Sequence, residues 1–414
     1  MMKVKNVEML ALNIPFYCDR VRMHMHRALT HSERLYVYRL DLDNGVIGYG
    51  ESSENESGNI ERILGKNPFT FVQDETVGFG LQMALVDAAG KAVEVPAYQF
   101  LGGKVRDRCP ISWWSIDMPP AHWVEEALES VRRGYTSIKL KARPWWDIFA
   151  QVDALAQAVP QHYRFYIDFN AFLLTKDFAV PILKRLDACP NVAYYESPFW
   201  LRTDIEGAKH LRNVVENPII DHFRESYLHS GAGDGFVVGG GATEVRRKGA
   251  LCASFDKPFW MQMVGSGITT AYAVHIGAVQ THARLPAITA HELWEHDLLK
   301  ERLIVEDGSI LVPETPGLGI EVDESALERY RVEPDAPTPQ DLFRRERRIC
   351  RIHIPNEDGG DTKHDFTGED VYAPAFSEGE YPGFAPGVWL EIIEDDGTDK
   401  FDASFERTVN NALQ

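Results

Sequence analysis

The sequence lacks the features that define several protein classes. No run of residues approaches the roughly eighteen consecutive apolar side chains of a membrane helix, and the N-terminus does not have the pattern of a signal peptide, so we expect a cytoplasmic protein with no membrane partner. Basic residues are scarce, because 43 Lys and Arg stand against 62 Asp and Glu, and the net charge of −19 argues against nucleic acid as a partner. The five cysteines form no CxxC pair and cannot all pair with one another, which indicates reduced thiols: Cys18, Cys109, Cys189, Cys252 and Cys350.

The acidic charge is concentrated at the C-terminus. Residues 355–414 contain fifteen acidic and three basic side chains, a net charge of −12, which leaves −7 for residues 1–354. This stretch is rich in turn-forming residues, but it also contains many aromatic side chains. We therefore interpret residues 355–414 as a solvated acidic extension that docks on the body of the protein or on another subunit.

Residues 1–108 have the pattern of a small α+β domain. Apolar and polar residues alternate over residues 35–51 on both sides of Asp43-Asn44-Gly45, and Asn-Gly between alternating runs predicts a β-hairpin. Residues 78–93 have the apolar spacing of a helix. An antiparallel sheet followed by helices predicts an α+β domain.

Residues 109–330 alternate short apolar runs with amphipathic stretches. Eight runs are typical of strands: residues 110–114, 137–141, 164–168, 192–196, 218–221, 235–238, 258–262 and 286–290. Helical patterns lie between most of them, for example over residues 121–133, 147–159, 203–214 and 268–283. Eight strands that each lead to a helix predict a parallel (β/α)8 barrel, in which the unit between Asp221 and Asp234 is too short to be complete.

Ionisable side chains gather at the predicted carboxyl ends of these strands, where a barrel of this kind carries its active site. Lys139 and Lys141 share one strand at a spacing of two, so both face the same side, and the apolar residues beside them suit the helix layer. Two lysines that point into a barrel repel each other, and burial disfavours their charge, so that one of them becomes a usable base. The alternative is a solvated edge strand with two exposed lysines.

Three carboxylates end consecutive predicted strands: Asp168, Glu196 and Asp221. Carboxylates that converge repel each other unless a cation lies between them, and all-oxygen ligation favours Mg²⁺. The third position is open, because His222 and Glu225 compete with Asp221. Helix capping is the alternative role for all three acids.

Glu292 follows the last predicted strand, within AHELWEH. This is not HExxH, since His291 and His296 are five residues apart and do not share a helix face, so a zinc protease is not indicated. A protonated Glu292 could donate a hydrogen bond to a developing oxyanion, and the alternative is an ordinary loop acid. No GxSxG or P-loop motif is present either, which leaves serine hydrolases and P-loop ATPases without support.

The order of these motifs resembles the mandelate racemase/muconate-lactonizing branch of the enolase superfamily. Residues 46–52, 85–108 and 316–323 are also similar to that family, and the likeness covers roughly residues 1–335. The resemblance implies an α/β fold, a modified (β/α)8 barrel (residues 109–330) with an N-terminal α+β capping domain (residues 1–108), a return segment to the cap (residues 331–354) and a C-terminal extension (residues 355–414). It also implies a homo-oligomer that acts on a small-molecule carboxylate.

The resemblance assigns a role to each candidate. Lys141 would abstract a proton α to a carboxylate with Lys139 tuning it, Asp168 and Glu196 would bind Mg²⁺ with Asp221 as the third candidate ligand, and Glu292 would help to stabilise the enediolate. Four further residues are expected to bind substrate: His24 and His26, where the cap loop meets it, Asn170 and Gln262.

Three departures from the family pattern shape the expected reaction. The third metal position lacks its Glu, the lysine expected at the sixth strand is missing, and Gln262 stands where racemases have a histidine at the seventh strand. A racemase needs a base on each face of the carbanion, and only one is evident here. We therefore expect a Mg²⁺-dependent lyase that eliminates water from an acid sugar or hydroxy acid. The alternatives are a racemase or epimerase of the same branch and a non-catalytic relative.

Overall fold

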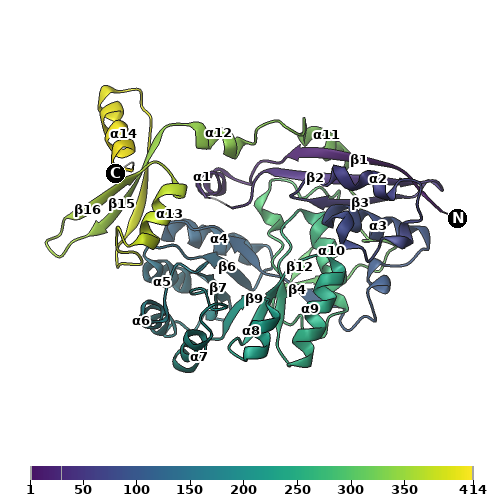
Figure 1. Ribbon diagram of the computed structural model, residues 1–414, viewed down its shortest axis with the longest axis horizontal. Coiled ribbons are helices and arrows are strands. Elements are labelled where there is room, and N and C mark those ends of the chain that lie inside the picture. The colour runs from purple at the N-terminus through teal and green to yellow at the C-terminus, as the bar shows by residue number, and fades with distance from the viewer. Residues whose placement is uncertain (1, 29, 413–414) are drawn as a thin grey trace.

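The N-terminal part of the chain is an antiparallel sheet covered by helices (Figure 1). The computed structural model describes residues 2–28 and 30–412. The strands lie in the order β14-β1-β2-β3, with bounds β1 (Val4–Asn13), β2 (Arg34–Leu42), β3 (Ile47–Ser52) and β14 (Arg331–Val332). The hairpin predicted within residues 35–51 is confirmed, since β2 and β3 pair antiparallel on either side of the Asn-Gly turn.

Helix α3 (Phe79–Ala92) packs against β3, as the spacing over residues 78–93 predicts. Glycines in β3 permit this close approach: a Cβ atom at Gly48 would lie 2.3 Å from the Ala84 carbonyl oxygen, and one at Gly50 would lie 2.1 Å from that of Gly80. The other helical pieces of this part are short: α1 (Asp19–Arg27), α2 (Ile60–Ile63), η1 (Ser57–Asn59), η2 (Pro68–Thr70), η3 (Glu75–Val77) and η4 (Ala97–Phe100).

The central part is a parallel barrel. Seven strands pair in chain order: β5 (Trp113–Ser115), β6 (Ser137–Lys141), β7 (Arg164–Asp168), β8 (Val192–Glu196), β9 (Ile219–His222), β10 (Gly235–Val238) and β11 (Phe259–Met261). Residues 286–290 join both edges of this sheet, because Ser112 N donates to Ala287 O at 3.0 Å and Ile288 N donates to Met261 O at 2.8 Å. The predicted barrel fold is therefore confirmed, with residues 286–290 in the eighth strand position.

Helices follow most of the strands on the outside of the barrel. They are α4 (Pro120–Arg132), α5 (Ile148–Ala158), α6 (Lys176–Leu186), α7 (Ile205–Val214), α8 (Glu225–Ser230), α9 (Ala242–Ser254) and α10 (Gly267–Ala278). The short α8 matches the incomplete unit expected after Asp221. The eighth strand position is followed by the turn η5 (His291–Leu293) and by β12 (Val305–Glu306) and β13 (Ser309–Leu311). These two strands form a small sheet with β4 (Arg108–Pro110), which precedes the barrel.

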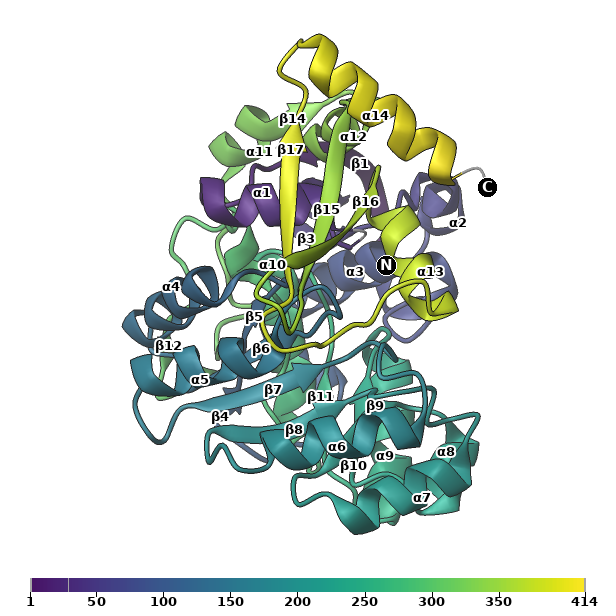
Figure 2. The same cartoon turned by 90° about the vertical axis from the view of Figure 1, so that its left-hand side faces the viewer.

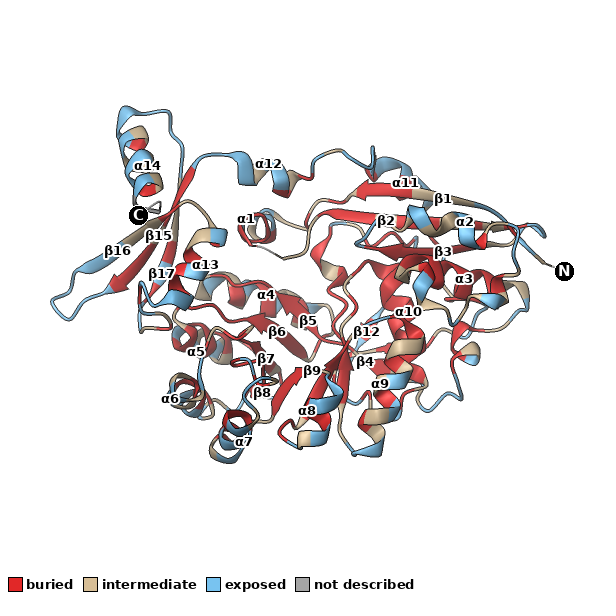
Figure 3. Cartoon of the chain, in the orientation of Figure 1, coloured by how far each residue is buried: buried red, intermediate tan, exposed pale blue. Residues whose placement is uncertain are grey.

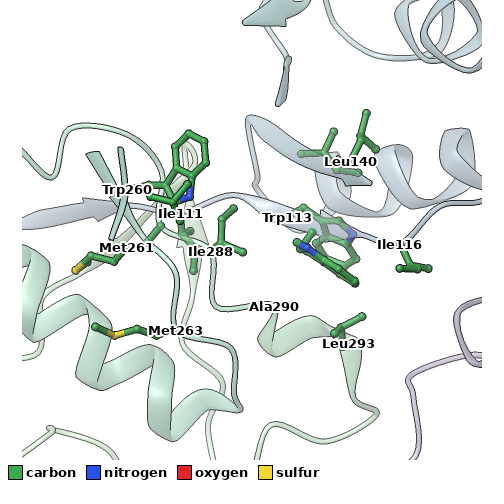
Figure 4. Close-up of a cluster of buried hydrophobic side chains, with 14 of the residues drawn as sticks. Ile111, Trp113, Ile116, Leu140, Trp260, Met261, Met263, Ile288, Ala290 and Leu293 are labelled. Atoms are coloured by element: carbon green, nitrogen blue, oxygen red, sulfur yellow. The ribbon is translucent and has the colours of Figure 1, made fainter. Parts of the chain in front are cut away.

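The barrel strands are buried, whereas most of the helices expose their outer faces and α10 is buried along its whole length (Figure 3). Figure 4 shows Ile288 of the closing segment among Ile111, Trp260 and Met261, so apolar packing supports the closure of the barrel. All five cysteines are free thiols. Among the described residues, none of the helices is long and apolar enough to cross a membrane.

The C-terminal part is a separate antiparallel sheet at one end of the molecule (Figures 1 and 2). The chain reaches it through α11 (Glu324–Tyr330) and α12 (Pro339–Arg345). Its strands are β15 (Arg348–Pro355), β16 (Asp361–Phe366) and β17 (Trp389–Glu394), with helices α13 (Glu369–Glu378) and α14 (Asp399–Ala412). β15 is the central strand, so this unit begins near residue 348 and includes residues that we expected in the return segment.

The extension docks on the body through the loops that follow β6 and β7. Phe384 N donates to Pro144 O at 2.8 Å, and Asp147 N donates to Val388 O at 3.1 Å. The Phe384 ring also lies 5.9 Å from that of Phe169, between centroids. These contacts account for the aromatic residues of an otherwise acidic segment.

A buried ionic cluster joins the extension to the cap and the barrel. Arg27 of α1 donates from Nη2 to Asp117 Oδ2 at 2.6 Å and from Nη1 to Glu369 of α13 at 3.1 Å. The same Asp117 oxygen accepts hydrogen bonds from the indole nitrogens of Trp145 (2.7 Å) and Trp146 (2.9 Å). Burial alone raises the pKa of Asp117, but the charge of Arg27, with that of Arg143 nearby, outweighs it and holds this pKa below its usual value.

We predict that Asp117→Asn lowers the free energy of unfolding by about 3 kcal/mol, because the buried Arg27 then keeps only the longer contact with Glu369 to balance its charge. Chemical denaturation followed by circular dichroism measures this change. Asp19→Asn is the matched control on α1: its carboxylate pairs with Arg22 at 2.7 Å but is 90% exposed, so its loss should cost less than about 1 kcal/mol. Equal losses for the two variants would contradict a structural role of the cluster.

Candidate functional site

Two lysines and two carboxylates meet at the carboxyl ends of β6, β7 and β8. Lys141, Asp168 and Glu196 are register partners on these neighbouring strands. Lys139 Nζ lies 2.6 Å from Glu196 Oε2 and 3.2 Å from Asp168 Oδ2, and Lys141 Nζ lies 2.6 Å from that same Asp168 oxygen. All four side chains are buried, so the structure brings these sequence-predicted residues together inside the barrel.

The surroundings make the two lysines chemically different. Burial alone lowers the pKa of Lys139, but Glu196 and Asp168 outweigh it, so the pKa is raised. Burial lowers the pKa of Lys141 more than Asp168 raises it, and the charge of Lys139 lowers it further. Lys141 is therefore the lysine that gives up its proton more readily, whereas Lys139 keeps its positive charge.

Two of the predicted substrate-binding residues contact these lysines. Asn170 Oδ1 accepts hydrogen bonds from Lys141 Nζ (2.9 Å) and from Arg143 Nη2 (3.0 Å), and Gln262 Oε1 accepts one from Lys139 Nζ (2.8 Å). The buried Arg143 is a residue of the site that sequence reasoning missed. The sequence does contain an indication of it, because Arg143 follows Lys141 at the same interval of two residues that separates Lys141 from Lys139.

Asp168 and Glu196 have the chemistry of ligands for a divalent cation. They are adjacent and buried, and the Glu196 oxygens lie 2.6 Å from Lys139 Nζ and 3.4 Å from His222 Nε2. Hard divalent cations prefer such oxygens. Within residues 2–28 and 30–412, however, no group of three or more His, Cys, Asp or Glu side chains is spaced to hold a metal ion. The residues fit a cation at two positions, and the third ligand is not in place.

The third candidate ligand, Asp221, is turned away from this pair. Its Oδ1 accepts hydrogen bonds from Ser197 Oγ and from the His222 amide at 2.7 Å each, and its Oδ2 lies 3.4 Å from Arg202 Nε. Glu196 is the register partner of Ile220 on β9. Because side chains alternate along a strand, His222 lies on the same face as Ile220 and Glu196, and Asp221 lies on the opposite face. His222 Nε2 indeed lies 3.4 Å from Glu196 Oε1, whereas the other alternative, Glu225, is on the exposed start of α8.

Glu292 lies in a different cluster. Its carboxylate contacts Arg133, Arg302 (3.2 Å) and the Tyr135 hydroxyl (3.3 Å), and none of its recorded contacts is with the lysines. Burial alone raises the pKa of Glu292, but His291 and the arginines outweigh it and lower the pKa to about 2. An ionised Glu292 cannot donate the hydrogen bond to an oxyanion that we considered for it.

The cap approaches the lysines through a different histidine from those expected. His24 Nε2 lies 2.9 Å from His122 Nδ1, and His26 pairs with Glu33, both on or beside α1. His31 is instead the residue near the site: its ring lies edge-on to Trp114, with 5.1 Å between centroids, and Trp114 is the register partner of Lys139. The sequence pattern pointed to His24 and His26 and did not single out His31.

The comparisons with known proteins agree with this geometry. Residues 122–226 and 236–326, most of the barrel, match the family model described as Enolase C-terminal domain-like. The N-succinylamino acid racemase of Thermus thermophilus is 31% identical over 267 residues, which cover 60% of this chain and 69% of that enzyme. The D-gluconate dehydratase of Thermoproteus tenax is 28% identical over 286 residues, 61% of this chain and 56% of that enzyme.

Solved structures extend the likeness to about four fifths of the chain. A mandelate racemase/muconate lactonizing family protein from Azoarcus sp. superposes with a TM-score of 0.66 at 25% identity and covers 81% of this chain and 98% of that one. An enolase from Thermobispora bispora, complexed with magnesium and formate, has a TM-score of 0.66 at 21% identity over 80% of this chain and 92% of that one, which shows the shared fold alone. The chain thus belongs to the mandelate racemase/muconate-lactonizing branch of the enolase superfamily, a family of enzymes.

Proposed function

We propose that this enzyme removes the proton α to the carboxylate of an acid sugar or hydroxy acid and eliminates water. The observation that carries this proposal is the contact of two buried lysines with two buried carboxylates at the mouth of the barrel. Support also comes from the similarity to D-gluconate dehydratase. The expectations of a homo-oligomer and of a cytoplasmic location remain predictions.

The residues of this chain divide the work between them. Lys141 Nζ accepts the α-proton, and Asn170 orients it through the 2.9 Å hydrogen bond. Lys139 keeps its charge and faces the negative charge that develops on the substrate. The C–O bond to the β-hydroxyl then breaks as Lys141 passes the proton that it accepted to the leaving oxygen. One water is released, and the remaining enol tautomerises to a 2-keto acid.

Asp168 and Glu196 would hold the Mg²⁺ that enzymes of this superfamily generally use, and His222, 3.4 Å from Glu196 Oε1, is a candidate for a third contact. When bound, the ion supplies electrostatic stabilisation of the negative charge on the substrate carboxylate.

We predict that Lys141→Ala lowers the rate of α-proton exchange with solvent by a hundredfold or more, about the contribution of a general base. Proton NMR in D2O measures the exchange for a panel of D-gluconate, D-galactonate, arabinonate and glucarate. Lys184→Ala, an exposed lysine on α6, is the control and should exchange at the wild-type rate. Full exchange by the Lys141→Ala protein would rule out this base.

For the metal, we predict that Glu196→Gln weakens Mg²⁺ binding at least tenfold, because it removes a charged ligand. Asp221→Asn should change the affinity less than threefold, roughly, since Asp221 points to Ser197 and Arg202. Isothermal calorimetry measures both. A larger loss for Asp221→Asn would assign the third ligand to Asp221, and no Mg²⁺ binding by the wild type would favour a non-catalytic relative.

A racemase or epimerase of the same branch is the second candidate. His31 favours it, because this histidine approaches the lysines from the cap, on a different side from the strand that carries Lys141. The racemase among the relatives also supports it. The NMR experiment separates the two reactions: loss of configuration at the α-carbon without formation of a 2-keto acid would select racemisation over dehydration.

A further inference from the structure

A cavity of about 410 Å³ lies between the cap, the barrel and α12. One side is formed by the cap, another by the barrel, and α12 completes it; the lining residues are Thr30, His31, Ser32, Arg34, Leu35 and Ser53 of the cap, Val264 and Trp294 of the barrel, and Gln340 and Arg344 of α12. Its volume is in the range of sites for small ligands. The lining contains no Asp or Glu, although the chain has a net charge of −19.

Two arginines bring positive charge to this cavity. Arg34 donates to neutral acceptors, namely Asn13 Oδ1 (2.9 Å) and the carbonyl oxygens of Pro334 (2.7 Å) and Ala336 (2.6 Å). Arg344 donates to the carbonyl oxygen of Ala28 at 2.7 Å. Within the described part of the chain, neither guanidinium forms an ion pair with a carboxylate. The hydrogen bonds hold both groups in place while their charge stays available to an anion.

His31 of the lining lies beside the lysine cluster, since its ring is 5.1 Å from that of Trp114, between centroids, and Trp114 is the register partner of Lys139. Burial, and then the charges of Lys141 and Lys139, lower the pKa of His31 to about 3. The imidazole is therefore neutral near pH 7. It separates the arginines from the lysines without adding a charge, and it can accept or donate a hydrogen bond to a ligand that spans both.

We propose that this cavity binds the second carboxylate of a dicarboxylic acid substrate, with Arg344 and Arg34 as its recognition residues. The inference rests on the proposed function for the position of the first carboxylate, which lies at Lys139 and Lys141. A guanidinium and a carboxylate make charge-assisted hydrogen bonds that a hydroxyl does not equal. The enzyme therefore selects acids with a negative charge at both ends.

Two six-carbon sugar acids make a matched pair of probes, since glucarate has a second carboxylate where D-gluconate has a hydroxymethyl group. We expect glucarate to bind the full-length protein about tenfold more tightly than D-gluconate, as measured by calorimetry. Arg344→Met should remove this preference and leave the affinity for D-gluconate within about twofold. Arg345→Met is the control, because Arg345 is the next residue of α12 and is not part of the lining.

Equal affinities of the wild type for the two acids, or a failure of both to bind, would overturn the inference. A loss of preference in Arg345→Met as large as in Arg344→Met would do so too, since a general effect of charge would then explain it. The outcome is separable from that of the proposed function. If Lys141→Ala keeps its α-proton exchange while Arg344→Met loses the preference, the reaction is wrong and the carboxylate site stands. If instead Lys141→Ala loses its α-proton exchange while Arg344→Met keeps the preference for glucarate, the carboxylate site is wrong and the proposed reaction stands.

Discussion

Lys139 lies within contact distance of Asp168 and Glu196 at a place that water hardly reaches, and the arrangement of the site follows from these contacts. Two adjacent carboxylates without a cation between them would repel each other inside the barrel. The Lys139 ammonium lies against both, which fixes its own charge and leaves Lys141 as the lysine with the lowered pKa. The positions of Asp168 and Glu196 thus explain why Lys139 keeps its charge and Lys141 can accept a proton.

The barrel alone does not complete the site. The cap contributes His31, and the loops after β6 and β7, which carry Arg143 and Asn170, are held from outside by the extension through Pro144 and Phe169. Three parts of the chain that are separate in sequence therefore determine the geometry around Lys141. This division agrees with the general rule that a scaffold positions loops and the loops provide specificity.

Much of this site was predictable from the sequence, because the carboxyl ends of parallel strands share one edge and alternation along a strand is regular. Lys139, Lys141, Asp168 and Glu196 follow from these two rules. These two rules do not decide between Asp221 and His222. A shift of the pairing by one residue changes which of the two faces Glu196, and the apolar residues Ile219 and Ile220 before them do not show which face is inside. The surroundings of Glu292 could not be read from the sequence, because its partner Arg133 is 159 residues away.

The ionic cluster of Arg27, Asp117 and Glu369 has a consequence for how the chain reaches this structure. Arg27 and Glu369 are separated by 342 residues, whereas Arg27 and Asp117 are separated by 90. A chain made on the ribosome from its N-terminus exposes Arg27 and Asp117 long before Glu369 exists. The cap and barrel therefore emerge with this cluster incomplete, and the loops after β6 and β7 gain their contacts with the extension only once residues 369–388 have been made.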